Sequence, residues 1–248
     1  MNQPLLVLAS ETSSPMGSIA LLRKSRPNAS TEILFHKQWL KERSHSEMIT
    51  LKTIESLNEC GVSLEQLSGL AVGVGPGSFT GVRVAINFIR SLGYSLNIPI
   101  TSLSSLLALA GPYLHPGEAP VLSMVNAYKN LLYVAAYQRT KEGKVQTLLE
   151  PQALTATVIE SKINKPHLVV GDGWPVFANQ FSPAFSQRNQ ILSEPTLYPL
   201  AKDLGALSLD MGCLAQTSDW SQVRPLYIRA SEAEEKLKVG LLKPLPEL

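Results

Sequence analysis

The sequence predicts an α/β protein with two similar lobes, each a mixed sheet with helices packed on it. Three observations support this fold class. The same order of elements occurs twice along the chain, a glycine-rich turn joins an apolar strand to a helix, and 248 residues with 44% hydrophobic content can bury a sizeable core. The first lobe is expected to span residues 1–110 with a C-terminal return at 221–248, and the second lobe residues 111–220.

The first half of the chain shows the periodicity of three strands followed by a helix, a strand and a second helix. Its strands are expected at 5–10, 18–23, 32–39 and 70–74. Ser44 with Glu47 three residues later forms a capping box, which predicts a helix that starts there and stops at Gly61. A second helix is expected from about Thr80 to Leu96.

The second half repeats this order of elements with weaker signals. Its strands are expected at 121–125, 131–138, 145–149 and 167–170. Helices are expected at 155–162 and around 199–215. The repetition predicts two copies of one unit, each able to bury one apolar sheet face.

The glycine turn at 75–83, with the sequence GPGSFTGVR, matches neither of the common phosphate-binding motifs. A P-loop requires Lys and then Ser or Thr, whereas here Gly81 is followed by Val82 and Arg83. The dinucleotide fingerprint requires its third glycine at Thr80, and no carboxylate stands about twenty residues further on. We therefore expect the turn to serve close backbone approach rather than phosphate binding.

The same string closely resembles the signature of the TsaB (YeaZ-like) family. Other landmarks of that family occur in order along the chain: Glu11-Thr12-Ser13, Arg43-Ser44-His45-Ser46-Glu47, Ile98-Pro99, Gly171-Asp172-Gly173-Trp174 and Pro225-Leu226-Tyr227-Ile228-Arg229. The resemblance covers most of the chain and is strongest over its first 110 residues. It implies the fold of the actin-like ATPase and sugar-kinase (ASKHA) superfamily, which agrees with the repeated layout.

The resemblance also implies a function that this chain does not perform alone. Proteins of the TsaB family are non-catalytic subunits of the bacterial machinery for threonylcarbamoyladenosine in tRNA, in which they dimerise with the TsaD transferase and support the ATPase TsaE. By this resemblance the chain is cytoplasmic, meets tRNA only indirectly and carries no cofactor beyond weak ATP or ADP binding at the interface of the complex. Whether the isolated chain forms a homodimer stays open.

The histidines do not show the spacing of a metal site. Four are present, at His36, His45, His115 and His167, and none has a second ligand three or four residues away on a helix. TsaD carries a His-x-x-x-His metal pair in its corresponding lobe, so its absence here agrees with a non-catalytic role. No metal ligand is therefore predicted.

The end of the first strand departs from the superfamily pattern. Members that hydrolyse ATP carry Asp there, whereas this chain has Glu11, whose extra methylene moves the carboxylate by about an ångström. Glu11 and Thr12 are either a vestigial nucleotide site, or Glu11 only hydrogen-bonds the following hairpin or the cleft. A second departure is Asn126, where relatives show Asp followed by a basic residue, which indicates a salt bridge lost as a pair.

The two helices of the first lobe carry apolar arcs wider than one sheet requires. On the first helix the arc is centred near Ile54 with Ile49 toward its edge, and on the second it is centred near Ile89 with Val84 toward its edge. The two helices could pack on each other, or part of each arc could meet a partner. The family resemblance favours the partner, and the predicted interface residues are Arg43, His45, Ile49, Thr53, Gly75, Gly77, Phe79, Arg83, Val84 and Asn87.

Bulk composition excludes several classes of protein. A net charge of +2 gives no field that would by itself capture nucleic acid, and no segment has the length and apolarity of a membrane span or a signal peptide. Cys60 and Cys213 are expected to be small buried hydrophobes. Two other functions stay open: an independent ATP-dependent acyl or phosphoryl transferase of the same fold, and a metalloprotease, against which the histidine spacing argues.

Overall fold

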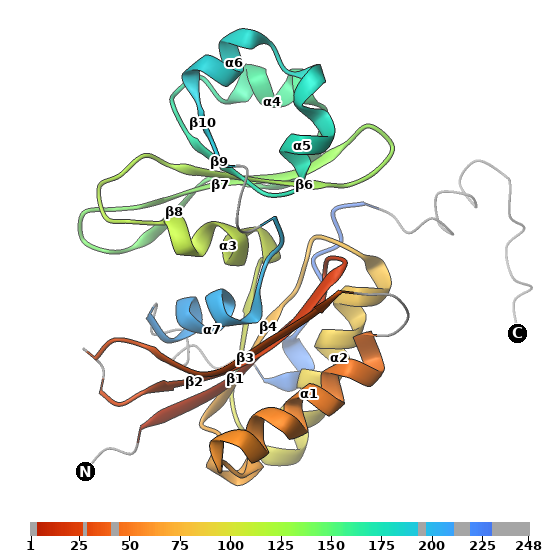
Figure 1. Cartoon of the computed structure of the whole chain (residues 1–248), viewed down its shortest axis with the longest axis vertical. Coiled ribbons are helices and arrows are strands. Elements are labelled where there is room, and N and C mark those ends of the chain that lie inside the picture. The colour runs from red at the N-terminus through yellow and green to blue at the C-terminus, as the bar shows by residue number, and fades with distance from the viewer. Residues whose placement is uncertain (1–3, 27–28, 41–44, 193–196, 211–218, 230–248) are drawn as a thin grey trace, which may run out of the picture.

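The computed structural model describes residues 4–26, 29–40, 45–192, 197–210 and 219–229. Within them lie two five-stranded sheets of the same topology, with helices between the sheets and on their outer faces (Figure 1). The strand orders are β3-β2-β1-β4-β5 and β8-β7-β6-β9-β10, and in each sheet three antiparallel strands continue into parallel ones. The predicted fold class, two similar lobes of the actin-like type, is therefore confirmed.

The first sheet and its helices come mainly from the first 110 residues. Its strands are β1 (Leu5–Glu11), β2 (Met16–Lys24), β3 (Glu32–Leu40), β4 (Gly69–Gly73) and β5 (Ile100–Leu103). The helices of this part of the chain are α1 (His45–Cys60), α2 (Phe79–Leu96) and α3 (Ser105–Ala110). Helix α2 begins where the Ser78 hydroxyl accepts the Gly81 N–H, and it ends at Asn97, whose φ of 52° is left-handed.

The second sheet comes from the middle of the chain. Its strands are β6 (Val121–Asn126), β7 (Leu132–Arg139), β8 (Val145–Leu154), β9 (Leu168–Val170) and β10 (Gln190–Ile191). The helices that follow β8 are α4 (Ala156–Lys162), α5 (Gly173–Phe177), α6 (Pro183–Arg188) and α7 (Ala201–Asp210). A short 3-10 turn, η5 (Trp220–Gln222), opens the last described segment.

The two lobes exchange one helix each. Helix α3 packs on β6 and β7 of the second sheet, whereas α7 packs on β1 and β2 of the first (Figure 1). The Ala201 N–H donates to Ser18 Oγ at 2.8 Å, and Gly205 lies so close to the first sheet that a Cβ there would be 2.3 Å from a Leu22 methyl group. The chain is thus back on the first sheet by residue 201, earlier than the predicted return at 221.

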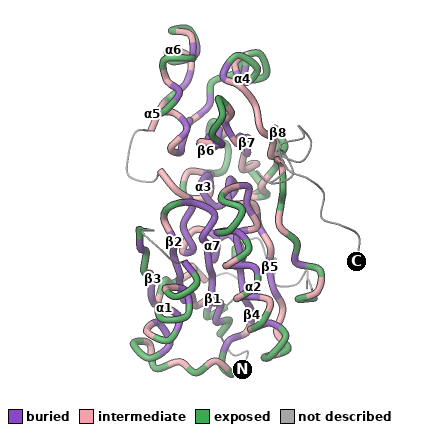
Figure 2. The backbone as a smooth tube through the Cα atoms, turned by 90° about the vertical axis from the view of Figure 1, so that its right-hand side faces the viewer, coloured by how far each residue is buried: buried purple, intermediate pink, exposed green. Residues whose placement is uncertain are grey.

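The cores follow from this arrangement. One apolar cluster fills the space between the two sheets and joins α3 and α7 to strands of both lobes. A second cluster lies between the first sheet and α1 with α2, and a third lies between the second sheet and α4, α5 and α6. Figure 2 shows the strands of the first sheet as mostly buried tube, with exposed stretches along α1 and α2. None of the helices in the described ranges is long and apolar enough to cross a membrane.

Candidate functional site

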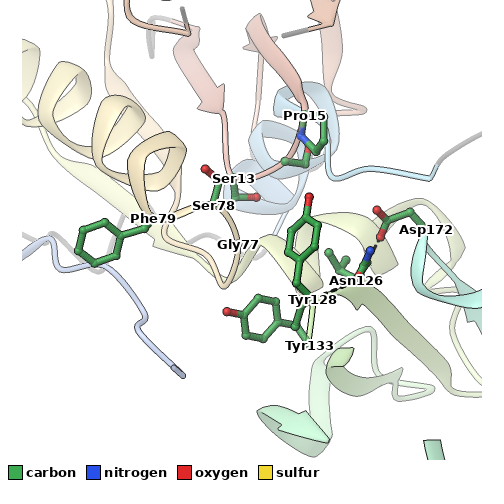
Figure 3. Close-up of a pocket in the computed structure, with 12 residues that line it drawn as sticks. Ser13, Pro15, Gly77, Ser78, Phe79, Asn126, Tyr128, Tyr133 and Asp172 are labelled. Atoms are coloured by element: carbon green, nitrogen blue, oxygen red, sulfur yellow. Dashed lines mark hydrogen bonds between the residues drawn. The ribbon is translucent and has the colours of Figure 1, made fainter. Parts of the chain in front are cut away.

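A cavity of about 440 Å³ opens between the two lobes, at the ends of β1 and β6 (Figure 3). The first lobe lines it with the turn after β1 and with the glycine turn, and the second lobe with the residues that follow β6. The lining residues are Ser13, Ser14, Pro15, Gly77, Ser78, Phe79, Val125, Asn126, Ala127, Tyr128, Tyr133 and Asp172. Because this is the cleft in which a two-lobed α/β enzyme would bind its substrate, it is the first candidate site.

The glycine turn packs backbone against backbone at the wall of this cavity. The Ser78 N–H donates to Ser13 O at 2.7 Å, and the Gly81 N–H donates to Ser78 Oγ. A Cβ on Gly77 would lie 2.2 Å from Ser13 O, and one on Gly81 would lie 2.0 Å from Thr12 O. Both glycines are thus required for close approach of the turn to the end of β1, and two N–H groups at the start of α2 are used within the chain.

Glu11 does not reach the cavity. Its side chain is fully buried, where Oε1 accepts the Ser13 N–H at 2.6 Å and Oε2 accepts the Ser105 hydroxyl at 2.7 Å. Burial raises the pKa of this carboxyl, an effect that the hydrogen bonds from Ser13 and Ser105 partly offset. Thr12 is fully buried as well and donates its hydroxyl to Gly81 O at 2.7 Å. The two residues predicted as a vestigial nucleotide site are therefore internal braces, as the second interpretation of Glu11 had it.

The second lobe presents one carboxylate to the cavity. Asp172 Oδ1 accepts the Asn126 N–H at 3.0 Å, and burial raises the pKa of Asp172. Asn126 in turn accepts the Tyr128 N–H through its side-chain oxygen at 2.8 Å. The lining residues named above include no Lys, Arg or His, so they offer hydroxyl groups, two tyrosine rings and an acid, but no cation for a polyphosphate.

The part of the chain that the structure describes holds no group of three or more His, Cys, Asp or Glu side chains able to share a metal ion. His45 has another role. Its Nδ1 accepts the Trp39 indole N–H at 3.1 Å, so its Nε2 donates to Ser14 O at 3.0 Å. This buried imidazole ties the start of α1 to β3 and to the turn after β1.

Three of the predicted interface residues on α1 lie inside the protein. His45 and Thr53 are buried, and Ile49 is 2% exposed within the core cluster under the helix. Their prediction as surface contacts is wrong for the free chain. Arg43, the remaining prediction near this helix, lies outside the described residues.

The error on α1 has a physical cause. The face that meets the sheet carries Thr53 and Ser56, whose hydroxyls donate to Ile49 O and Thr53 O within the helix. Because these polar residues are satisfied and buried, the sheet-facing stripe did not stand out as apolar, and Ile54 was placed at the centre of the arc. The structure instead leaves Ile54 53% exposed and Leu51 49% exposed. These two residues were missed, and only the polar residues of the buried stripe could have signalled it.

On α2 the predicted residues divide differently. Ile89 is fully buried, and Val84 is partly buried against the same cluster. Phe79, Arg83 and Asn87 are exposed, and Figure 3 shows Phe79 directed away from the cavity. Since α1 and α2 also contact each other, mutual packing accounts for part of both arcs.

Comparison with known proteins agrees with this geometry. The family model described as TsaD, tRNA N6-adenosine threonylcarbamoyltransferase, matches residues 39–237. The chain is 27% identical over 239 residues to the tRNA threonylcarbamoyladenosine biosynthesis protein TsaB of Escherichia coli, which covers 93% of this chain and 97% of that protein. It is likewise 27% identical over 234 residues to TsaB of Bacillus subtilis, covering 94% and 97% of the two chains.

Solved structures give the same result. A protein from Pseudomonas aeruginosa described as similar to peptidase YEAZ superposes with a TM-score of 0.74 at 27% identity, covering 92% of this chain and 100% of the other. YeaZ from the same organism superposes with a TM-score of 0.72 at 25% identity and covers 91% of this chain and 100% of its own. The chain therefore belongs to the TsaD family and, within it, to the TsaB (YeaZ-like) group.

Proposed function

We propose that this chain is the non-catalytic, TsaB-type subunit of a system that makes threonylcarbamoyladenosine in tRNA. In this proposal it dimerises with a TsaD-like transferase, activates it, and supports the binding of a TsaE-like ATPase. The names of its relatives support the pathway, and the assignment of a supporting role depends on the site itself.

One observation carries the non-catalytic assignment. The carboxylate at the end of β1, where an ATP-hydrolysing relative would act on its nucleotide, is fully buried and held by Ser13 and Ser105. A phosphoryl-transfer site requires charged groups aimed at the phosphates, and the cavity residues of this chain supply no cation. The cleft therefore has the shape of a nucleotide site without its charges.

The partner surface that we propose is the outer side of α1 and α2, defined here by Leu51, Ile54 and Val84. Leu51 and Ile54 are about half exposed, although aliphatic side chains of this size gain free energy when buried. Val84 lies on the neighbouring helix and is partly buried. A TsaD-like subunit that packs its own helices here would cover these side chains.

The experiment measures association of the full chain with the TsaD-like protein of the same organism. Ile54→Glu and Leu51→Glu should each weaken binding by about 30-fold or more, because a charge would be buried at a hot spot. Val176→Glu on α5 is the matched control, since Val176 is 53% exposed on the other lobe. A reconstituted reaction should lose threonylcarbamoyladenosine formation with the α1 variants and keep it with the control.

Two outcomes would overturn the proposal. One is full partner binding by both α1 variants, provided that their thermal unfolding midpoints equal that of the unmodified chain. The other is phosphate release from ATP by the isolated chain at about one per second, an ordinary enzyme rate, that Glu11→Gln abolishes. The second result would identify the chain as an independent ATP-dependent transferase.

A further inference from the structure

The exposed aromatic side chains gather along one edge of the molecule. Among the described residues, the five most exposed Phe, Tyr and Trp side chains are Phe79 (37%), Tyr94 (68%), Tyr128 (71%), Trp220 (38%) and Tyr227 (44%). Two of them lie on α2 and two on the segment 219–229, which runs beside α2 (Figure 1). Tyr128 stands at the mouth of the cavity, where its carbonyl oxygen lies within reach of Arg229.

The segment 219–229 is anchored to the first lobe and reaches the second. Val223 is buried in the core cluster beneath α2, and the Leu226 N–H donates to Val74 O at 2.8 Å. At the far end Arg229 Nη1 donates to Ala127 O at 2.5 Å. The aromatic rings of this segment are therefore held in fixed positions beside α2.

On α2 the side chains that face this segment form one stripe. Phe79, Arg83, Asn87, Arg90 and Tyr94 follow one another at intervals of three or four residues, which places them on one face of the helix. We call this stripe, together with Trp220 and Tyr227, the aromatic row. Each end of the row holds a pair of rings with an arginine beside it.

At the start of α2, Arg83 Cζ lies 3.8 Å from the centre of the Phe79 ring, and Phe79 stacks on Tyr227 with ring centres 5.0 Å apart. Toward the end of the helix, Tyr94 meets Trp220 edge to face at 5.0 Å, and Arg90 Cζ lies 5.6 Å from the Trp220 ring. A hollow of about 350 Å³ opens at this second pair and is lined by Asn87, Arg90, Ser91, Tyr94 and Trp220. An edge-to-face pair leaves ring faces open to a third planar group.

The row is also the positive edge of a nearly neutral chain. Helix α2 and the segment 219–229 together carry four arginines and one aspartate, a net charge of +3, whereas the whole chain has +2. Within the described ranges, neither Arg83 nor Arg90 forms a salt bridge with a carboxylate. Both guanidinium groups therefore keep N–H donors for an anionic ligand.

We propose that the aromatic row binds unpaired nucleotides of an RNA. Proteins bind single strands by stacking bases on aromatic rings and by placing cations along the backbone, and the row supplies both at regular intervals. A purely protein partner is disfavoured because the exposed aliphatic side chains of this lobe, Leu51 and Ile54, lie on α1 and outside the row. That the ligand is RNA rests on the proposed function, and it implies direct contact with tRNA in place of the indirect one expected from the family.

The test is fluorescence anisotropy of the full chain with a labelled, unstructured RNA of about twelve nucleotides and with an RNA duplex of the same length. The single strand should bind more tightly. Tyr94→Ala and Trp220→Ala should each weaken its binding between about five-fold and a hundred-fold, the range for one stacked base. Arg83→Gln with Arg90→Gln should reduce the slope of log affinity against log salt by about 1.4.

Matched controls lie elsewhere on the surface. Leu148→Ala on β8 removes a side chain that is 46% exposed, and Arg26→Gln removes an exposed arginine, so both should leave RNA affinity unchanged. Equal binding of single strand and duplex, or no binding by the unmodified chain, would overturn the proposal. Unchanged affinity in Tyr94→Ala would do the same, and this side chain is too exposed for its loss to unfold the helix.

The two proposals fail separately. If Ile54→Glu loses the TsaD-like partner and keeps RNA affinity, both stand. Loss of the partner in the aromatic variants, with RNA affinity intact, would make the row a protein interface and overturn the RNA proposal alone. RNA binding by the row in a chain that never associates with a TsaD-like protein would overturn only the proposed subunit role.

Discussion

The first strands of the two lobes end in the same local hydrogen bond, made by a carboxylate in one lobe and by an amide in the other. In the first lobe Glu11 Oε1 accepts the N–H of Ser13, and in the second lobe Asn126 Oδ1 accepts the N–H of Tyr128, in each case two residues further on. An oxygen acceptor at this position is therefore what the following turn requires, and a negative charge is not.

The surroundings of the two residues differ. Glu11 is fully buried and shares its second oxygen with Ser105, whereas Asn126 is partly exposed at the cavity and donates its N–H to Asp172. The strand-to-helix turns differ in the same sense: the first leads into the 18-residue α2 and the second into the 5-residue α5. The first lobe is braced internally at the place where the second is open, so matched substitutions should cost more in the first.

The largest difference is expected at the strand-to-helix turns. Gly81→Ala should lower the free energy of unfolding by about 4 kcal/mol or more, because the added Cβ would lie 2.0 Å from the backbone oxygen of Thr12. Gly173→Ala should cost about 1–3 kcal/mol, since its nearest neighbour is the movable Leu132 side chain at 2.4 Å. Chemical denaturation measures both.

Gly61→Asn is the control for these substitutions. Gly61 has nothing within 4 Å of its Cβ position and a φ of 61°, which asparagine tolerates. Equal losses at Gly81 and Gly173 would show that the two turns are equally constrained.

At the end of β1, Glu11→Ala should lower the free energy of unfolding by about 2–4 kcal/mol. The truncation leaves the buried Ser13 N–H and Ser105 hydroxyl without their acceptor. Glu11→Gln keeps an oxygen in place and should cost about 1 kcal/mol. If Gln were as damaging as Ala in urea denaturation, the charge itself would matter and the likeness to Asn126 would fail.

The charge of Glu11 should nevertheless appear in the pH dependence of stability. Burial raises the pKa of this carboxyl above its ordinary 4.5, so the folded state binds the proton more tightly than the unfolded state does. The resulting stabilisation is complete below pH 4.5 and is lost as pH rises through the folded pKa. Unfolding free energies of the unmodified chain minus those of Glu11→Gln should fall across this window, and a constant difference would contradict the burial argument.

The smallest effect is expected in the second lobe. Asn126→Ala should lower the free energy of unfolding by about 1 kcal/mol, because the Tyr128 N–H that loses its acceptor lies at the surface and can bind water. A loss as large as that of Glu11→Ala, measured by the same denaturation curves, would mean that the two lobes are braced alike.

Much of the fold could be predicted because its strands and long helices have clear periods. The predicted strand 5–10 corresponds to β1 and the predicted helix from Thr80 to Leu96 to α2, within a residue or two. The short elements β5, α3, α5, α6 and β10 were not predicted, since four to six residues or fewer carry no measurable period. Strand β8 runs five residues past its predicted end at 149 because β7 continues to pair with it.

The site was harder to predict than the fold. That Gly77 and Gly81 serve backbone approach followed from the failed phosphate motifs, because a glycine's role is local. Which face of α1 is buried depends on the sheet beneath it, and no local signal distinguished Ile49 from Ile54. The aromatic row was invisible for the same reason, since Trp220 and Tyr227 meet α2 only after the chain has passed through the second lobe.

The exchange of α3 and α7 between the lobes fixes an order of events on the ribosome. Ala9 and Leu22 of the first sheet are fully buried by α7, whose residues are synthesised about a hundred positions after α3. At about 5–20 residues per second, the inner face of the first sheet waits roughly 5–20 s for its cover. The amino-terminal half of the nascent chain therefore cannot finish folding until almost the whole protein has been made.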